Sequence, residues 1–355
     1  MPRYVEAMNN NHMRLVGTSG LIVAPLALGG NVFGWTADEA TSCAILDAFV
    51  DAGGTMIDTA DVYSAWAPGH VGGESERVIG NWLRRDPSKR DKVVIATKVG
   101  FLDGKLEKVS YDGKADSVEY VASLHPEVIA RGAEASLKRM GIETIDLYYQ
   151  HRDNPDVPLA DSLGAFETLR AAGKIRATGL SNFSAARVEE ALDVAVKTGI
   201  EPAVAVQGWY NMVERSKYEG ELQDVVTGRG VAFFPYYSLA NGLLTGKYRS
   251  KDDLGKSVRG DRNVDYIDSP KGKAVLAALD EVAAETGASL ATVALAWTNA
   301  QGGITAPVAS ATSMAQAREL IAALTLDLSP GQIEALDRAS EAYRDASPST
   351  LSGEP

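Results

Sequence analysis

Short apolar runs alternate with longer amphipathic segments along most of the chain. The runs are four to six residues long and rich in residues that favour strands. Most are apolar on both faces, as strands buried inside a parallel sheet are. They span residues 25–29, 55–59, 93–98, 145–150, 175–180, 203–207, 231–236 and 304–308.

The segments between these runs have the period of amphipathic helices, and their ends carry helix signals. They cover residues 38–52, 74–85, 126–140, 159–172 and 185–197. Asp38 and Glu39 place acid at one start, Gly141 stops one helix, and Gly53 and Gly173 follow others. Eight strands with intervening helices predict a closed (β/α)8 barrel of the TIM type, which typically takes about 250 residues or more.

A doubly wound open sheet is the alternative fold. Its dinucleotide-binding form carries a Gly-x-Gly-x-x-Gly fingerprint after the first strand. The sequence at 28–31 is Leu-Gly-Gly-Asn, which lacks that spacing. The pattern therefore favours the barrel.

Residues 13–345 are expected to form this barrel, flanked by two irregular ends. Residues 1–12 form a polar extension without the apolar stretch of a secretory leader, and residues 346–355 are rich in Ser, Pro and Gly. We expect the extension to be disordered and the tail to be flexible. Residues 13–23 predict a hairpin that closes the bottom of the barrel.

Two long polar excursions, 100–125 and 239–269, follow the third and seventh runs. Loops of this length in a compact domain are usually functional. In a barrel the loops that follow strands lie at the C-terminal face, where active sites are found. Both excursions are therefore expected beside the site.

Composition narrows the classes of partner. The formal charge of −12 argues against nucleic acid and against an anionic membrane surface, and no apolar run reaches the length of a membrane span. A single cysteine, Cys43, excludes an internal disulfide and indicates a reducing, cytoplasmic setting. The four histidines are too widely spaced to predict a metal site.

Chemically useful side chains gather at the ends of three runs. Asp58 and Lys98 lie at the ends of the second and third runs, His151 follows the fourth, and Tyr63 comes five residues after Asp58. A tyrosine with a pKa near 10 is a poor proton donor at neutral pH, and a nearby ammonium lowers that pKa. Lys98 is expected to do this, held by Asp58, while His151 orients a carbonyl group.

Each of these residues alone also has an ordinary interpretation. A lone Asp after a strand is most often a turn or cap residue, and a lone Tyr is most often packing. A Lys that ends a strand is commonly solvated, and a loop His is commonly satisfied by backbone. Their convergence on one barrel rim favours a catalytic group.

Five motifs give the chain a resemblance to a known family. They are Asp-Thr-Ala-Asp-Val-Tyr at 58–63, Ala-Thr-Lys at 96–98, Asp-Leu-Tyr-Tyr-Gln-His at 146–151, Gly-Leu-Ser-Asn-Phe at 179–183 and Gly-Leu-Leu-Thr-Gly-Lys-Tyr at 242–248. In order and at this spacing they resemble the aldo-keto reductases over residues 13–345. The resemblance implies a barrel that binds NADPH in extended form and a catalytic tetrad of Asp58, Tyr63, Lys98 and His151, with Tyr63 as general acid/base.

The resemblance also implies a set of cofactor contacts. Ser181, Asn182 and Gln207 would bind the nicotinamide carboxamide, although a Ser-Asn pair after a strand is also a common helix cap. Tyr236 would stack on the nicotinamide, or else pack within the barrel. The further contacts expected are Gly30, Asn31, Asp58, Leu239, Gly242, Lys247 and Arg259, with Arg259 reaching the adenosine phosphate.

One stretch departs from the family pattern. Many members carry Arg or Lys at the adenosine-phosphate segment, where this chain has Ser310, Thr312 and Gln316. Phosphates favour Arg forks, so the lack of Arg or Lys at these positions leaves NADH use open. NADPH is still the expected cofactor. The basic excursion at 239–269 is expected to compensate.

Aromatic and cationic residues are expected to line the substrate mouth. They are Phe33, Trp35, Tyr63, Trp66, His70, His151, Arg152, Trp209 and Tyr237. Such a mixture suits a polar aldehyde such as an oxidised sugar, although several of these side chains are equally plausible core aromatics. The predicted function is reduction of a small-molecule carbonyl to the alcohol.

Two other functions stay open. The resembled family includes potassium-channel β subunits, which bind nicotinamide cofactor within an assembly. A Schiff-base lyase with Lys98 as nucleophile is the third interpretation, although Asp58 beside the lysine favours the non-nucleophilic ammonium. The pattern carries no signal for oligomeric state.

Overall fold

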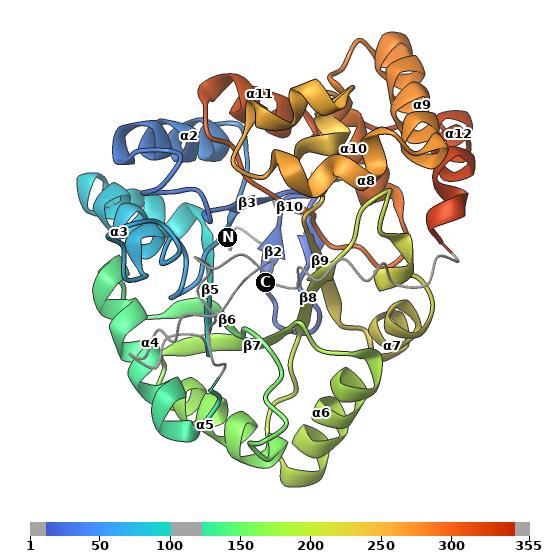
Figure 1. Cartoon of the computed structure of the whole chain (residues 1–355). Coiled ribbons are helices and arrows are strands. Elements are labelled where there is room, and N and C mark those ends of the chain that lie inside the picture. The colour runs from blue at the N-terminus through green and yellow to red at the C-terminus, as the bar shows by residue number, and fades with distance from the viewer. Residues whose placement is uncertain (1–11, 101–122, 345–355) are drawn as a thin grey trace.

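The computed structural model describes residues 12–100 and 123–344. Eight parallel strands form a nearly closed barrel with helices around it (Figure 1). The fold is the predicted (β/α)8 barrel. In sheet order the strands are β10 (Val308–Ala309), β3 (Ala27–Gly29), β4 (Met56–Asp58), β5 (Val94–Val99), β6 (Ile145–Gln150), β7 (Ile175–Ser181), β8 (Ala205–Trp209) and β9 (Ala232–Tyr236).

The last strand corrects one prediction. The expected run was 304–308, whereas β10 is Val308–Ala309. Pro307 has no N–H to give to a ladder, and only its carbonyl is used, as acceptor for Ala27 N at 3.0 Å. Earlier in the run an isolated bridge joins Ile304 to Phe233 of β9, so the barrel closes through single contacts.

Helices cover the outside of the barrel, and the predicted end signals lie at their ends. The Asp38 side chain accepts from Thr41 N at 2.8 Å, and Gly141 ends α4 with a φ of 67°. The helices are α2 (Glu39–Asp51), α3 (Glu74–Arg85), α4 (Pro126–Met140), α5 (Leu159–Ala171), α6 (Ala185–Thr198), α7 (Glu221–Arg229), α8 (Val264–Ile267), α9 (Pro270–Thr286), α10 (Leu290–Ala300), α11 (Met314–Ala322) and α12 (Pro330–Ser340).

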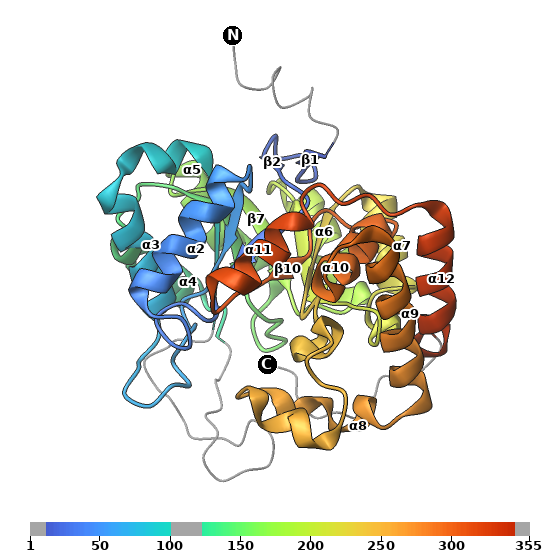
Figure 2. The ribbon, with the colours of Figure 1, turned by 90° about the horizontal axis from the view of Figure 1, so that it is seen from above.

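The predicted hairpin is present at the bottom of the barrel. It consists of β1 (Arg14–Leu15) and β2 (Ile22–Val23), paired antiparallel. Figure 2 shows it at the end of the barrel opposite α8. Val16 and Val23 are fully buried with the residues that fill the barrel interior, so the hairpin plugs this end.

The strand register places the candidate residues at the other end. Asp58 is in register with Gly29 and with Ala96, and Lys98 with Tyr149. These positions lie at the C-terminal ends of β3 to β6. The parallel arrangement therefore gathers side chains from distant parts of the sequence at one rim.

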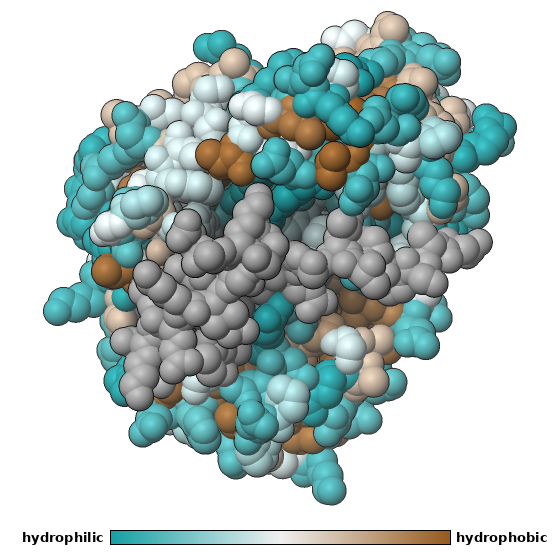
Figure 3. All heavy atoms as spheres, in the orientation of Figure 1, coloured by the Kyte–Doolittle hydropathy of each residue, from teal (hydrophilic) through white to brown (hydrophobic). Residues whose placement is uncertain are grey.

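The second excursion folds over this C-terminal face. Its part from 240 to 267 forms η3 (Ala240–Thr245), η4 (Lys251–Lys256), η5 (Gly260–Asn263) and α8. Figure 3 looks onto the same face, where the visible surface is mostly hydrophilic with separate hydrophobic patches. Most of the first excursion, the extension 1–12 except His12, and the tail 346–355 lie outside the described residues.

None of the helices within 12–100 and 123–344 has the length and apolar character that a membrane crossing requires.

Candidate active site

Lys98 is the centre of the site. Its Nζ donates to Asp58 Oδ2 at 2.6 Å, to the carbonyl oxygen of Thr59 at 2.8 Å and to Tyr63 Oη at 3.0 Å. A lysine ammonium has three N–H donors, and here each has an acceptor. The geometry is that of a charged ammonium bridging a carboxylate and a phenol.

Both members of the ion pair are buried. Asp58 is 1% exposed and Lys98 is 0% exposed. Burial lowers the pKa of Lys98, and the charge and hydrogen bond of Asp58 oppose that change. Asp58 is therefore the group that keeps the amine charged.

The prediction that the pKa of Tyr63 is lowered is wrong. Burial raises that pKa well above its ordinary value, and the negative charge of Asp58 raises it further. The phenol thus holds its proton at neutral pH. Lys98 still favours the phenolate once it forms, because its N–H points at the phenol oxygen.

His151 lies beside the phenol, as predicted. The two ring centroids are 6.0 Å apart, and the His151 amide donates to Val99 O at 2.9 Å. Burial and the charges of Lys98 and Arg152 lower the pKa of His151 well below its ordinary value. The imidazole is therefore neutral and has one ring N–H to donate.

The predicted carboxamide contacts form one network with the tetrad. Gln207 Nε2 donates to Asp58 Oδ1 at 2.8 Å, and Asn182 Nδ2 donates to His151 O at 2.9 Å. Asn182 has a φ of 58°, which turns the chain away from β7 immediately after the buried Ser181. Tyr236 Oη donates to Asn182 Oδ1 at 2.6 Å, so its ring borders the same pocket.

The predicted pyrophosphate segment has a run of left-handed backbone conformations. Tyr237, Ala240, Asn241 and Gly242 all have positive φ, and the N–H groups of Ala240 and Gly242 donate to Tyr237 O at 2.7 Å and to Leu239 O at 2.8 Å. Asn241 Oδ1 is buried without a hydrogen-bond partner in this part of the chain. A Cβ on Gly242 would lie 2.7 Å from Lys247 Nζ, so the amine sits directly over the loop.

The remaining predicted cofactor residues lie in three places. Ser310 Oγ donates to Asn31 Oδ1 at 2.6 Å, beside Gly30, whose N–H donates to Asp58 O at 2.7 Å. Thr312 Oγ1 donates to Gln316 Oε1 at 3.0 Å at the start of α11. Leu239 precedes η3.

Arg259 lies nearer to the tetrad than its predicted role suggests. Its guanidinium carbon is 5.7 Å from the centre of the Trp35 ring. Its positive charge also acts to lower the pKa of Tyr63. The charge of Arg259 is thus placed toward the reaction centre.

The aromatic residues predicted at the mouth form two groups. The Trp35 and Trp66 centroids are 5.6 Å apart, and the Tyr63 and Trp66 centroids are 6.0 Å apart. In the second group the Trp209 and Tyr237 centroids are 4.9 Å apart. Arg262 Nη1 donates to Tyr237 Oη at 3.1 Å, which ties η5 to the second group.

Three further residues expected at the mouth, Phe33, His70 and Arg152, lie outside these two aromatic groups. Phe33 is 0% exposed and packs in the main core, with its carbonyl accepting from Ser64 Oγ at 3.1 Å. His70 is half-buried in the turn after Trp66. Arg152 is also half-buried, and its charge reaches His151.

The sequence reasoning missed three neighbours of Lys98. The Thr59 carbonyl is its third acceptor, and Asp61 and Glu76 are buried carboxyl groups that would raise the pKa of Lys98 when ionised. The backbone contact had no signal in the sequence. The carboxyl groups had one, because Asp61 lies inside the 58–63 motif and Glu76 lies in the first turn of an amphipathic helix, on its apolar side.

A barrel with a Lys–Asp–Tyr–His group at its C-terminal rim and a lysine over the adjacent loop is the arrangement expected of a nicotinamide-dependent oxidoreductase. The model of the Aldo/keto reductase family matches residues 25–341. The chain belongs to that family and is an NAD(P)H-dependent oxidoreductase, as predicted.

Three relatives show how the family is represented. "Uncharacterized oxidoreductase YrpG" of Bacillus subtilis (strain 168) is 33% identical over 88% of this chain and 91% of its own length. "Protein tas" of Escherichia coli (strain K12) is 31% identical over 92% of this chain and 96% of its own length. A "Putative voltage-gated potassium channel subunit beta" of Schizosaccharomyces pombe (strain 972 / ATCC 24843) is 30% identical over 81% of each chain.

Proposed function

We propose that this enzyme reduces a polar aldehyde or ketone to the alcohol with NADPH, using Tyr63 as the proton donor. The observation that carries the proposal is the single ammonium that bridges Asp58 at 2.6 Å and Tyr63 at 3.0 Å. A buried phenol that keeps its proton, next to a cation that favours the phenolate, is suited to giving that proton to an oxygen that becomes negative.

The four residues divide the work of proton transfer. Tyr63 donates its proton to the carbonyl oxygen of the substrate as negative charge develops there. Lys98 then stabilises the phenolate, and Asp58 holds Lys98 in place. His151, being neutral, donates a ring N–H to the same oxygen and orients the carbonyl toward Tyr63. The bound nicotinamide supplies the hydride.

The residues present fit a dinucleotide. The ammonium of Lys247 over the loop at 240–242 suits a pyrophosphate, and the polar groups of Ser181, Asn182 and Gln207 suit a carboxamide. Ser310, Thr312 and Gln316 would hold the adenosine end through hydroxyl and amide groups. Neutral donors bind a phosphate less tightly than Arg does, so selectivity for NADPH over NADH should be modest.

Steady-state kinetics with both cofactors tests this preference. We expect kcat/KM for NADPH to exceed that for NADH, by about tenfold rather than the several hundredfold of an Arg fork. A clear NADH preference contradicts the proposed cofactor.

The mouth supports a polar substrate. Trp35, Trp66 and Trp209 offer apolar faces, while Arg152 and Arg259 bring positive charge next to them. This mixture suits a molecule with both carbon-hydrogen faces and hydroxyl groups. A panel of sugar aldehydes and aromatic aldehydes decides the point, and a uniformly higher kcat/KM on the aromatic compounds would reject a sugar-like substrate.

A nicotinamide-binding assembly module is the second candidate, because one relative is named as a potassium-channel β subunit. The intact Asp58–Lys98–Tyr63 contacts favour the enzyme. Cofactor binding followed by fluorescence, together with turnover of the aldehyde panel, separates the two: a module binds NADPH but reduces no carbonyl in the panel.

A Schiff-base lyase finds little support in this geometry. Its lysine must be neutral to attack a carbonyl, whereas Lys98 spends its three donors on acceptors and is paired with Asp58. Borohydride trapping of a substrate on Lys98 would revive it. The expected cytoplasmic location remains a prediction.

A further inference from the structure

Asp61 is a buried carboxyl group immediately behind the tetrad. It lies between Asp58 and Tyr63 in the sequence and is 2% exposed. Its backbone N–H donates to Lys98 O at 3.2 Å, which fixes it against β5. Within the described chain, Oδ1 of Asp61 has no hydrogen-bond partner. A charged carboxylate in such a place is costly unless a cation pairs with it.

The cations around Asp61 already have carboxylates of their own. Lys98 is paired with Asp58 at 2.6 Å. Arg139 Nε donates to Glu76 Oε2 at 2.5 Å, and Thr97 Oγ1 donates to Glu76 Oε1 at 2.7 Å. Glu76 is 0% exposed, so its charge is not relieved by solvent.

A charge count over the groups that face Asp61 shows an imbalance. They are Asp58 of β4, Lys98 of β5, Glu76 of α3, Arg139 of α4 and the phenol of Tyr148 on β6. The phenol is neutral, because burial raises its pKa well above the ordinary value. Among the described residues, two cations thus face two carboxylates, and an ionised Asp61 would add a buried negative charge that none of these cations balances.

We propose that Asp61 holds a proton in the folded enzyme at neutral pH, and that it is a positioning residue whose neutrality leaves Asp58 as the sole carboxylate partner of Lys98. If Asp61 ionised, its charge would compete with Asp58 for the ammonium and weaken the hold of Lys98 on Tyr63.

The surroundings of the group agree with this assignment. Burial raises the pKa of Asp61 to about 8, and the charge of Glu76 raises it too. The charge of Arg139 and the backbone N–H groups of Val62 and Gly100 act in the opposite direction without overcoming burial. A proton on Asp61 requires no cation, so it resolves the imbalance.

The effect on stability has a definite sign. In the unfolded chain Asp61 loses its proton near pH 4, whereas in the folded chain it does so near pH 8. Between these values folding takes up a proton, so Asp61 destabilises the fold progressively as the pH rises from about 4 to about 8. The penalty is constant above that range and absent below it.

Thermal melting of Asp61→Asn across pH 5 to 9 tests the proposal. Asparagine mimics the neutral acid and has no penalty, so the variant should melt above the parent by a margin that widens up to pH 8, on the order of several °C, and then levels off. A variant that melts below the parent by a constant margin would show that Asp61 is an ordinary charged residue and would overturn the proposal.

Asp253→Asn serves as the matched control. Hydrogen bonds from Lys256 and from the backbone N–H groups of Arg249 and Ser250 lower the pKa of Asp253. Its removal should therefore cost stability at neutral pH, and the cost should shrink toward acid. The two aspartates should give opposite signs at pH 7.

Glu76→Gln and infrared spectroscopy test the proposal if Asp61→Asn folds poorly. Without the Glu76 charge, Arg139 becomes available to Asp61. The pH range in which folding takes up a proton should therefore lie at lower pH in Glu76→Gln than in the parent. The carbonyl stretch of a protonated carboxylic acid should be present in the parent at pH 7 and missing in Asp61→Asn. A parent without this band contradicts the proposal.

The consequence for turnover rests on the proposed function. As the pH rises through 8, the parent should lose kcat/KM for carbonyl reduction, and the ratio of Asp61→Asn to parent should increase about tenfold from pH 7 to 9. If this ratio does not change with pH while the melting curves are as expected, the protonation of Asp61 is supported and its effect on Lys98 is rejected. The melting and infrared readouts need no catalysis, so they stand if no carbonyl substrate is turned over.

Discussion

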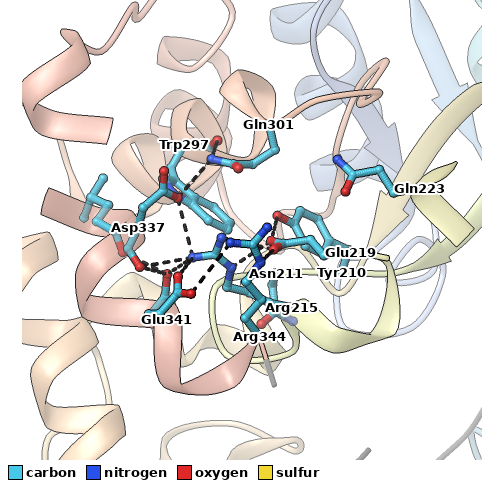
Figure 4. A network of polar contacts seen from close by, with 12 residues as sticks. Tyr210, Asn211, Arg215, Glu219, Gln223, Trp297, Gln301, Asp337, Glu341 and Arg344 are labelled. Atoms are coloured by element: carbon cyan, nitrogen blue, oxygen red, sulfur yellow. Dashed lines mark hydrogen bonds and ion pairs between the residues drawn. The ribbon is translucent and has the colours of Figure 1, made fainter. Parts of the chain in front are cut away.

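Two buried cations in this molecule serve different ends. Lys98 at the barrel rim and Arg215 at the side of the barrel are 0% and 3% exposed, and each has a carboxylate partner. Arg215 makes a two-point contact with Glu219, with Nε–Oε1 at 2.7 Å and Nη2–Oε2 at 3.1 Å. Its remaining donor, Nη1, reaches Asp337 O and Ser340 Oγ of α12 (Figure 4).

The difference lies in what surrounds each cation. The side chains next to Arg215 make further hydrogen bonds: Tyr210 Oη donates to Glu219 at 2.7 Å, and Trp297 Nε1 donates to Asp337 at 3.0 Å. Hydrogen bonds and ion pairs raise the pKa of Arg215 in spite of burial. Lys98 instead spends one donor on a phenol that carries a reactive proton. The contacts of Arg215 join η2 (Arg215–Lys217) to α12. The contacts of Lys98 instead include a phenol that can lose its proton.

Removing the proton donor should have the largest effect. Tyr63→Phe deletes the hydroxyl to which Lys98 donates and retains the ring. We expect kcat to fall by about 10²–10⁴-fold, the usual contribution of a positioned acid. NADPH binding and the melting temperature should stay close to those of the parent. Unchanged turnover would show that another group donates the proton.

Breaking the second ion pair should act on stability instead. Arg215→Met leaves the largely buried Glu219 with Arg344, at 3.1 Å, as its remaining ion-pair partner among the described residues, and should lower the free energy of unfolding by about 3 kcal/mol. Denaturant unfolding measures this loss, and the remaining folded protein should keep the kcat of the parent.

Arg229→Met is the control for that comparison. Arg229 is exposed and pairs with Asp193 at 2.8 Å. Exposed pairs contribute about 0–1 kcal/mol, so the loss should be several times smaller. Equal losses from the two variants would deny that burial distinguishes the Arg215 network.

These two regions also mark what the sequence predicts well. Asp58 and Lys98 lie at or near the ends of strands and His151 directly follows one. In a parallel barrel the strand ends meet, so the meeting of these residues follows from strand order alone. Arg215 lies in a loop, and its partner Ser340 is 125 residues away on α12. That contact depends on how α12 packs, and no local pattern encodes it.

The same reasoning explains the error about the Tyr63 pKa. Lowering of that pKa was inferred from charge alone, whereas burial, which reverses the sign, depends on how the rim is covered. The adenosine contact of Arg259 stays a prediction. The place of its guanidinium over the Trp35 ring depends on the fold of residues 239–269, which is not periodic and gave no signal.

A third cation extends the comparison with an intermediate effect. Lys247 is half-buried over the positive-φ loop and contacts the Tyr248 ring at 4.9 Å. If its charge serves the cofactor, Lys247→Met should raise KM for NADPH about tenfold and leave kcat nearly unchanged. The increase should shrink as ionic strength rises, because salt screens exposed charges. A fall in kcat with constant KM would place Lys247 in the chemical step.

The smallest predicted effects come from two buried phenols, one on each side of the comparison. Tyr210 Oη donates to Glu219, so Tyr210→Phe leaves a carboxylate oxygen short of a donor and should cost about 1–3 kcal/mol.

Tyr148 Oη is buried with no hydrogen-bond partner among the residues the structure describes. Tyr148→Phe removes an unpaired polar group and retains the ring packed 5.1 Å from Phe166, so its free energy of unfolding should change by less than about 0.5 kcal/mol or increase. A loss at Tyr148 as large as that at Tyr210 would mean that the polar region behind the tetrad is as fully paired as the Arg215 network, and the contrast between the two regions would fail.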